Sequence, residues 1–188
     1  MAKVTPHPIT DPLRGMLGSV VFRHVNGQLI ASYRPRPTQN PPTERALDRI
    51  AKFKRASAYA KSAMADPELA AVYRPIAHTR GQTGYATALG DYYSQPTVTA
   101  IVLEAYRGKI GDAIAVEAHE DVAIKSVHVE VRAADRTVIE SGDAAATASG
   151  WRYAATQALP AGTGVSVQAT ACDYAGNCAS KTVPFGPL

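Results

Sequence analysis

The chain has 188 residues, a length that accommodates one large domain or two small ones. Small and aliphatic residues are plentiful enough for a packed core without metals or many disulfides, and no apolar run reaches the ~20 residues of a membrane-spanning helix, so we expect no membrane span. The net charge of +4 is unevenly spread along the chain, which favours two modules with different surfaces.

The charge changes sign between the two halves. Up to Pro96 there are thirteen Lys and Arg residues against six Asp and Glu, a net charge of +7. From Thr97 onward seven basic residues oppose ten acidic ones, a net charge of −3. This contrast predicts two domains, residues 1–96 and 97–188.

The first residues, MAKVTPHPITDPLRG, contain no apolar segment of the kind that a secretory signal peptide requires. We therefore expect the protein in the cytoplasm by default. A non-classical export route or a phage particle, which would carry it to a surface, is the alternative.

The segment SVVFRHVNGQLIASYR predicts a β-hairpin. Asn26 and Gly27 are the preferred pair for a two-residue type I′ turn, because both positions need a positive φ. A turn there opposes three pairs on one largely apolar face: Val20 with Tyr33, Phe22 with Ala31, and His24 with Leu29. The other face carries Arg23 and Arg34. Because an isolated hairpin is marginally stable in water, we expect the apolar face to dock on another element.

A helix is predicted to begin near Pro41–Thr43, with Asn40 or Thr43 as its N-cap. Along it, apolar and small side chains recur at alternating spacings of four and three residues, which makes one helical stripe. The stripe consists of Ala46, Ile50, Phe53, Ser57, Ala60 and Met64. A short helix restarts at Asp66-Pro67 and is interrupted by Pro75, and a third covers the segment TGYATALGDYY. A helical hairpin packed with the β-hairpin is the economical arrangement.

A second stripe on the first helix is basic and consists of Arg45, Arg49, Lys52 and Arg55. We expect it to dock an acidic partner or a neighbouring subunit, with the Arg23 and Arg34 face adding to the same surface. Contacts to nucleic-acid phosphates are the alternative, although no recognised nucleic-acid motif accompanies the stripe. A solvated helix face would explain the same charges without any partner.

The segment from Gly15 to Lys61 resembles a family of uncharacterised bacterial proteins found in Bacteroidetes. Its members share a Gly-x-x-Gly-x-Val start, a short hairpin, an Arg-x-Arg/Pro connector and an Asn-Pro-Pro-Thr-Glu helix start. The matching residues here are Gly15, Gly18, Val20, Asn26, Gly27, Arg34, Asn40, Pro42, Thr43, Glu44, Arg49 and Phe53. The family has no established activity, so the resemblance implies a grouping and no function.

From Thr97 onward the hydrophobic period changes from helical to two. Seven short segments alternate apolar and polar residues between turn signals: TAIVLEAY, DAIAVEAHE, KSVHVEVRA, RTVIES, GWRYAAT, GVSVQATA and ASKTVP. This pattern predicts an Ig-like antiparallel β-sandwich. The expected fold class is therefore α+β, with an N-terminal β-hairpin and helical hairpin followed by the sandwich.

The ending VSVQATACDYAGNCASKTV resembles the closing hairpin of bacterial Ig-like and fibronectin-type modules, which commonly reads Val-x-Ala-x-Asp-x-x-Gly-Asn-x-Ala. The matching residues are Val167, Ala169 or Ala171, Asp173, Gly176, Asn177 and Ala179. SGWRYAAT is similar to strand E of the same modules. The resemblance implies a sandwich that serves as a spacer, an adhesion surface or a domain that contacts carbohydrate or protein.

Cys172 and Cys178 flank the turn of this hairpin. If the five residues between them form the turn, the two cysteines oppose each other on the outer face, within reach of a disulfide. Asp173 can then accept hydrogen bonds from the turn's amides, and Gly176 or Asn177 can take the left-handed position. Two thiolates alone make a poor zinc site. We expect a disulfide in an oxidising compartment and two free thiols otherwise.

No arrangement of residues in the sequence predicts catalysis. A Gly-x-Ser-x-Gly nucleophile elbow is missing, and neither cysteine has a neighbouring histidine. His119 and His128, expected on neighbouring strands near Glu120, lack zinc-ligand spacing, and Asp143 and Asp173 lack the oxygen-ligand ladder of a calcium loop. We therefore expect no catalytic residue, no cofactor and no metal.

These observations favour a non-catalytic structural or interaction protein of bacterial or phage origin. It would act as an assembly or surface-contact component through its basic helix face and the sandwich loops 140–150 and 173–177, with a protein or a second copy as partner. A nucleic-acid-associated protein is the first alternative. An adhesin or carbohydrate-binding module is the second, and it needs exposed Tyr106, Tyr153 or Tyr174.

Overall fold

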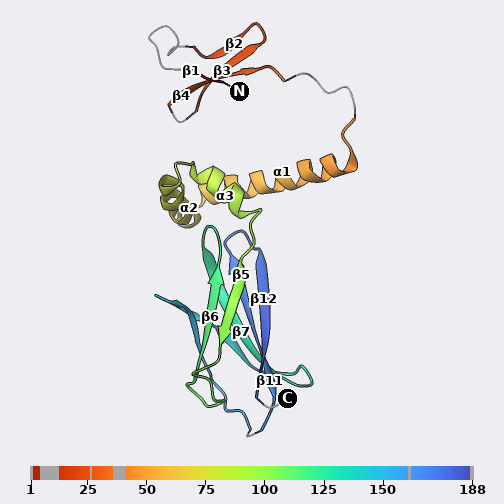
Figure 1. Cartoon of the computed structure of the whole chain (residues 1–188), viewed down its shortest axis with the longest axis vertical. Coiled ribbons are helices and arrows are strands. Elements are labelled where there is room, and N and C mark those ends of the chain that lie inside the picture. The colour runs from red at the N-terminus through yellow and green to blue at the C-terminus, as the bar shows by residue number, and fades with distance from the viewer. Residues whose placement is uncertain (1, 5–12, 26, 36–40, 161, 187–188) are drawn as a thin grey trace. The chain divides into compact units, whose positions relative to one another are not determined.

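The computed structural model describes residues 2–4, 13–25, 27–35, 41–160 and 162–186 (Figure 1). These residues form α-helices and three antiparallel sheets, which confirms a mixed α+β class. The chain separates into two compact units, Met1–Leu47 and Asp48–Leu188. Strand β5 (Thr97–Val102) begins at the predicted domain boundary, and that boundary stays a prediction.

The first unit contains a four-stranded sheet in the order β1-β4-β3-β2. Its strands are β1 (Ala2–Val4), β2 (Gly15–Leu17), β3 (Val20–Val25) and β4 (Gln28–Tyr33). The predicted hairpin register is confirmed, because Val20 opposes Tyr33, Phe22 opposes Ala31 and His24 opposes Leu29. Gly27 has the positive φ that the turn requires, 75°, whereas Asn26 lies outside the described residues. The sequence did not predict β1 and β2, which are only three residues long.

Three helices follow: α1 (Glu44–Ala65), whose first turn belongs to the first unit, α2 (Pro67–Thr79) and α3 (Gly84–Asp91). The backbone N–H of Ala46 donates to Thr43 Oγ1 at 3.3 Å, and the side chains of Asp66 and Thr83 cap α2 and α3 in the same way. The other expected N-cap, Asn40, lies outside the described residues. Within the described part of the chain, no helix combines the length and the apolar character that crossing a membrane needs.

The prediction that Pro75 interrupts the second helix is wrong, because α2 continues through it. A proline in a helix removes one backbone hydrogen bond. Tyr73 and Ala77, on either side, are buried, and packing of this kind supplies most of a helix's stability in a protein. The three helices share a small core of Ala60, Ala63, Tyr73 and Ala88, against which Val122 and Tyr174 from the strand connections also pack.

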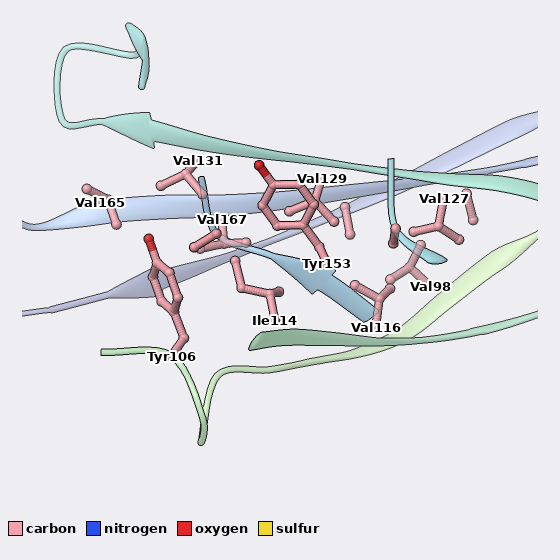
Figure 2. Close-up of a cluster of buried hydrophobic side chains, with 14 residues drawn as sticks. Val98, Tyr106, Ile114, Val116, Val127, Val129, Val131, Tyr153, Val165 and Val167 are labelled. Atoms are coloured by element: carbon pink, nitrogen blue, oxygen red, sulfur yellow. The ribbon is translucent and has the colours of Figure 1, made fainter. Parts of the chain in front are cut away.

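Two four-stranded antiparallel sheets follow, in the orders β5-β6-β10-β9 and β12-β11-β7-β8. The strands after β5 are β6 (Ala113–His119), β7 (Ile124–Ala133), β8 (Val138–Asp143), β9 (Ala145–Thr147), β10 (Gly150–Ala154), β11 (Val165–Asp173) and β12 (Cys178–Phe185). Side chains of both sheets meet in one core, as Figure 2 shows for Ile114 and Val116 opposite Val129 and Val167. The alternation read from the sequence is therefore confirmed for the strands that line this core.

The expected loop 140–150 is wrong, because this segment contains the end of β8 and all of β9. Glu140 is buried, and its Oε2 accepts hydrogen bonds from the backbone N–H groups of Thr156 and Gln157 at 2.6 and 3.1 Å. The Thr156 and Tyr153 hydroxyls donate to the same oxygen at 2.8 and 3.2 Å. A carboxylate that receives four donors stabilises the segment after β10, so Glu140 has a structural role.

Replacing Val129 by Ala should lower the free energy of unfolding by about 2 kcal/mol, because the side chain is fully buried and its loss leaves a cavity. Urea denaturation followed by circular dichroism measures the change. Val138→Ala is the matched control, since this side chain is 44% exposed and its truncation should change the free energy by less than about 0.5 kcal/mol. Equal losses in both variants would contradict the shared core.

Candidate functional site

The basic residues of α1 lie on a helix that is longer than its neighbours. At about 1.5 Å per residue, the 22 residues of α1 extend about 33 Å, against about 20 Å for the 13 residues of α2. Its buried residues, Ala56, Ala60 and Ala63, all lie in the second half of the helix. Small side chains there allow close packing against α2 and α3. The first half of α1 is therefore left uncovered within the second unit.

The predicted apolar stripe of α1 is only partly buried. Ile50 and Phe53 are 47% and 52% exposed, although the stripe as a whole was expected to face a core. The buried row of Ala56, Ala60 and Ala63 shares Ala60 with that stripe, but its centre is rotated by roughly 70° from the centre of the stripe, at about 100° per residue. The prediction assumed that the more hydrophobic row of a helix faces the core. In α1 the alanines face the other helices instead, because their small side chains allow close packing, and the larger Ile50 and Phe53 are left about half exposed.

Three of the basic residues extend the buried row toward the N-terminus. Arg45, Arg49 and Lys52 continue the spacing of four and three residues that leads to Ala56, whereas Arg55 lies on another side of the helix. All four are exposed. The Lys52 ammonium lies 4.8 Å from the centroid of the Tyr93 ring, a cation–π contact. We call Arg45, Arg49, Lys52, Ile50 and Phe53 together the α1 face.

Arg23 and Arg34, expected to add to the same surface, belong to the sheet of the first unit. Arg23 lies in β3 opposite Ile30, and Arg34 follows β4, where its backbone N–H donates to the Ser19 carbonyl at 2.8 Å. Both side chains are exposed. Whether they join the α1 face in one surface stays a prediction.

The closing hairpin has a register in which Cys172 opposes Cys178. Their Cα atoms are 4.2 Å apart and the two sulfurs form a disulfide. In the turn, the Asn177 backbone N–H donates to Asp173 Oδ1 at 2.7 Å, and Gly176 takes the left-handed position with φ of 90°. The turn motif and the disulfide thus both stabilise the end of the hairpin where β11 passes into β12.

Asp173 also takes part in an acidic cluster that joins the helices to the sheets. Asp91 is the last residue of α3, Glu120 follows β6, and Asp173 ends β11. One carboxylate oxygen from each lies within 4.8 Å of the other two. Asp91 and Asp173 are buried and Glu120 is half-buried. We call these three residues the acidic junction.

Hydrogen bonds hold each carboxylate of the acidic junction in place. The Tyr73 hydroxyl donates to Asp91 Oδ2 at 2.6 Å, and Val122 and Ala123 donate their backbone N–H groups to Glu120 Oε2 at 2.6 and 2.8 Å. Asn177 Nδ2 donates to Asp173 Oδ2 at 2.8 Å and to the Asp91 carbonyl at 3.3 Å. One side chain of the closing turn therefore contacts both the sheet and the end of the helical segment.

Burial and mutual repulsion make it unfavourable for all three carboxylates of the acidic junction to be ionised. Burial raises the pKa of Asp91 to about 6, the Tyr73 hydrogen bond opposes the increase, and the charges of Glu120 and Asp173 add to it. Burial, together with the hydrogen bond to Asp91, also raises the pKa of Tyr73, so this hydroxyl stays a donor. Three carboxylates at this spacing need a proton or a cation to be stable together.

Sequence reasoning missed the acidic junction. Asp173 and Glu120 were each noted, but as a single loop carboxylate and as a neighbour of the histidines, and Asp91 was not singled out at all. The three positions have no common motif or spacing. The available signal was Asp91 itself, a carboxylate at the end of a helix with no other charged residue. Asp is rarely buried unless it is paired, so its burial in the structure indicates a specific environment.

Other expected sites are not assembled. His119 and His128 lie on β6 and β7, which belong to different sheets, so the prediction of neighbouring strands is wrong. His128 Nδ1 lies 2.7 Å from Asp143 Oδ1 instead. Tyr106 and Tyr153 are buried and Tyr174 packs against the helical core, which removes the exposed aromatics that a carbohydrate site needs. Trp151, expected in the core, is half-buried at its margin.

Comparison with known proteins adds little. None of the known protein families matches the chain, and no curated protein matches it. Among solved structures, an engineered protein is similar with 24% identity over 49% of this chain and a TM-score of 0.34. The similar region covers 20% of that protein's length. A similarity this weak establishes neither the fold nor the function of the chain, and the two family resemblances stay predictions.

Protein purified without reductant should show no thiol that reacts with a thiol reagent, because Cys172 and Cys178 are paired. The double variant Cys172→Ser/Cys178→Ser should lower the free energy of unfolding by about 2 kcal/mol, since the disulfide closes only a short loop. Urea denaturation measures the loss, and wild-type protein in reductant serves as control. Two reactive thiols in the native, unreduced protein would contradict the pairing.

Proposed function

We propose that the protein is a non-catalytic interaction component of bacterial or phage origin that docks on an acidic protein through the α1 face. The observation that carries the proposal is the uncovered first half of α1. There, basic Arg45 and Arg49 adjoin Ile50 and Phe53, which are about half exposed. A charged row beside an apolar row suits a partner that supplies both carboxylates and apolar contacts.

The partner is a different protein rather than a second copy of this chain. From Thr97 onward acidic residues outnumber basic ones by three, but Glu140 and Asp173 are buried and Glu130 pairs with Arg132. The accessible surface of the two sheets is therefore nearly balanced in charge. The sheets of a second copy would therefore present the α1 face with a surface of low net charge.

The two facing sheets serve in this proposal as an Ig-like spacer. Support comes from the shared core between the sheets, the alternation of buried and exposed residues in β7 and β11, and the resemblance of the closing hairpin to such modules. A spacer needs a rigid body whose ends are free to connect to other parts of the protein or to a partner. The helical segment at one end of the sheets presents the α1 face.

The double variant Arg45→Glu/Arg49→Glu should weaken binding of an amphipathic peptide of Glu and Leu residues by roughly tenfold or more, because it reverses the charge of the α1 face. Fluorescence anisotropy of the labelled peptide measures the dissociation constant. The matched control is Arg55→Glu/Lys61→Glu, which makes the same charge change on the same helix outside the α1 face and should alter binding less than about twofold.

Nucleic-acid binding is the second candidate, favoured by the exposed Phe53 beside the basic row, where a base can stack. Random-sequence single-stranded DNA in the same assay separates the two. Binding to DNA with a steep salt dependence, and none to the peptide, would replace the proposed function by the second candidate. Binding to neither, at low salt, would overturn both.

A further inference from the structure

The acidic junction brings together carboxylates from three parts of the second unit that are distant in sequence. Asp91 belongs to the helical segment, whereas Glu120 and Asp173 extend from the sheets. Their nearest oxygens lie within 4.8 Å of one another, and the contacts to Tyr73, Val122 and Asn177 fix each group. The three carboxylates are thus fixed in position by hydrogen bonds and differ from mobile acidic side chains on a surface.

Two oxygens of the junction are buried and lack a hydrogen-bond partner among the described residues: Asp91 Oδ1 and Glu120 Oε1. Asp91 is fully buried, so water cannot solvate it freely. An unpartnered buried polar atom costs about 1–3 kcal/mol, and more when it is charged. No ion pair in the described part of the chain links a Lys or Arg side chain to these carboxylates. Among the described residues, the junction therefore has no Lys or Arg partner that would offset its negative charge.

We propose that the acidic junction binds a calcium ion, with Asp91, Glu120 and Asp173 as its protein ligands. Hard divalent cations prefer carboxylate oxygens, and at Ca²⁺–oxygen distances of about 2.3–2.6 Å any two ligands of one ion lie at most about 5 Å apart, a limit that the three oxygens satisfy because they lie within 4.8 Å of one another. Ca²⁺ also tolerates irregular ligand arrangements, whereas Mg²⁺ demands a near-ideal octahedron. Each Asp173 oxygen accepts one hydrogen bond and keeps a lone pair for coordination, whereas Glu120 would coordinate through Oε1, because its Oε2 already accepts two hydrogen bonds.

An approach to the junction exists on the side of Asp91. A surface cavity of about 230 Å³ lies beside Asp91, which is itself fully buried, and its lining also includes Ser94, Asp121 and Arg80. The Arg80 guanidinium donates to the Asp121 carbonyl, so it is held by the backbone next to Glu120 and, among the described residues, makes no ion pair with the junction. Such a volume admits a hydrated cation and several waters. Waters held there can complete the six to eight ligands that Ca²⁺ takes.

Calcium in this site would connect the helical segment to the sheets. In its absence, two hydrogen bonds between described residues link these parts: the 3.3 Å contact from Asn177 to the Asp91 carbonyl, and the bond from the Arg80 guanidinium to the Asp121 carbonyl. A bound cation would join α3, the β6–β7 connection and the closing hairpin, and would offset the repulsion among the three carboxylates. This inference is independent of the proposed docking function, since no residue of the α1 face contributes to the site.

The test is thermal unfolding of the full chain after removal of metals with EDTA. Calcium at a hundredfold excess over its dissociation constant should raise the Tm by about 5–10 °C, because it binds the folded state alone. Asp91→Asn and Glu120→Gln should abolish this shift. Both variants retain an acceptor oxygen for Tyr73 or for Val122 and Ala123, and without calcium they should unfold at the wild-type Tm or above it, since a repulsive charge is removed.

The matched control is Asp121→Asn, which removes an exposed carboxylate next to the junction and should keep the full calcium shift. Terbium provides a second readout, because it replaces Ca²⁺ in oxygen sites and is excited through a nearby tyrosine. Wild-type protein should show sensitised emission through Tyr73 that Ca²⁺ displaces, and Glu120→Gln should show none.

Three results would overturn the calcium site. One is the absence of a Tm shift in wild-type protein at millimolar Ca²⁺, which would mean that the junction holds a proton instead. Another is an equal shift in Asp91→Asn and Glu120→Gln, which would place binding elsewhere. The third is a larger shift with Mg²⁺ than with Ca²⁺.

Discussion

Asn177 in the closing turn links the helices to the sheets, where Val122 and Tyr174 also pack against the helical core. Its side-chain amide donates to Asp173 within its own hairpin and to the Asp91 carbonyl at the end of α3. The disulfide between Cys172 and Cys178 lies directly beside it and holds the strand ends from which the turn projects. A short Asp-x-x-Gly-Asn turn therefore closes a hairpin and also sets where α3 meets the sheets. Any change that moves Asn177 would disturb both the turn and the acidic junction.

The two buried acidic sites of this protein show how hydrogen bonding decides the role of a carboxylate. Glu140 places one oxygen among four donors, so its charge is stabilised by the protein itself. Asp91 receives one donor from Tyr73 and faces two other carboxylates. The same functional group is thus a structural acceptor in one place and an incomplete ligand set in the other. Glu140 Oε1 and Asp91 Oδ1 are both buried without a partner among the described residues, so the difference lies in the four donors that Glu140 Oε2 receives and in the two carboxylates beside Asp91.

The two candidate surfaces use charge in opposite ways. The α1 face is exposed, and water screens its arginines, so they cost little when no partner is present. The acidic junction is buried, where repulsion between like charges is strong, and it must be neutralised within the molecule. A docking surface of the first kind can be reversed by substitution with little effect on stability. A site of the second kind couples ligand binding directly to the stability of the fold.

The sequence by itself determined the features that depend on neighbours along the chain. Period-two alternation located every strand of the two facing sheets except β9, Asn26-Gly27 defined the register of the first hairpin, and Asp66-Pro67 marked the start of α2. These follow from backbone geometry and local hydrogen bonds, which a pattern of residue types encodes. Only the tertiary structure decided that α2 continues through Pro75, that α1 buries alanines rather than Ile50 and Phe53, and that β9 replaces a loop. It alone brought Asp91 together with Glu120 and Asp173, because the packing of distant segments, unlike a local pattern, leaves no spacing in the sequence to read.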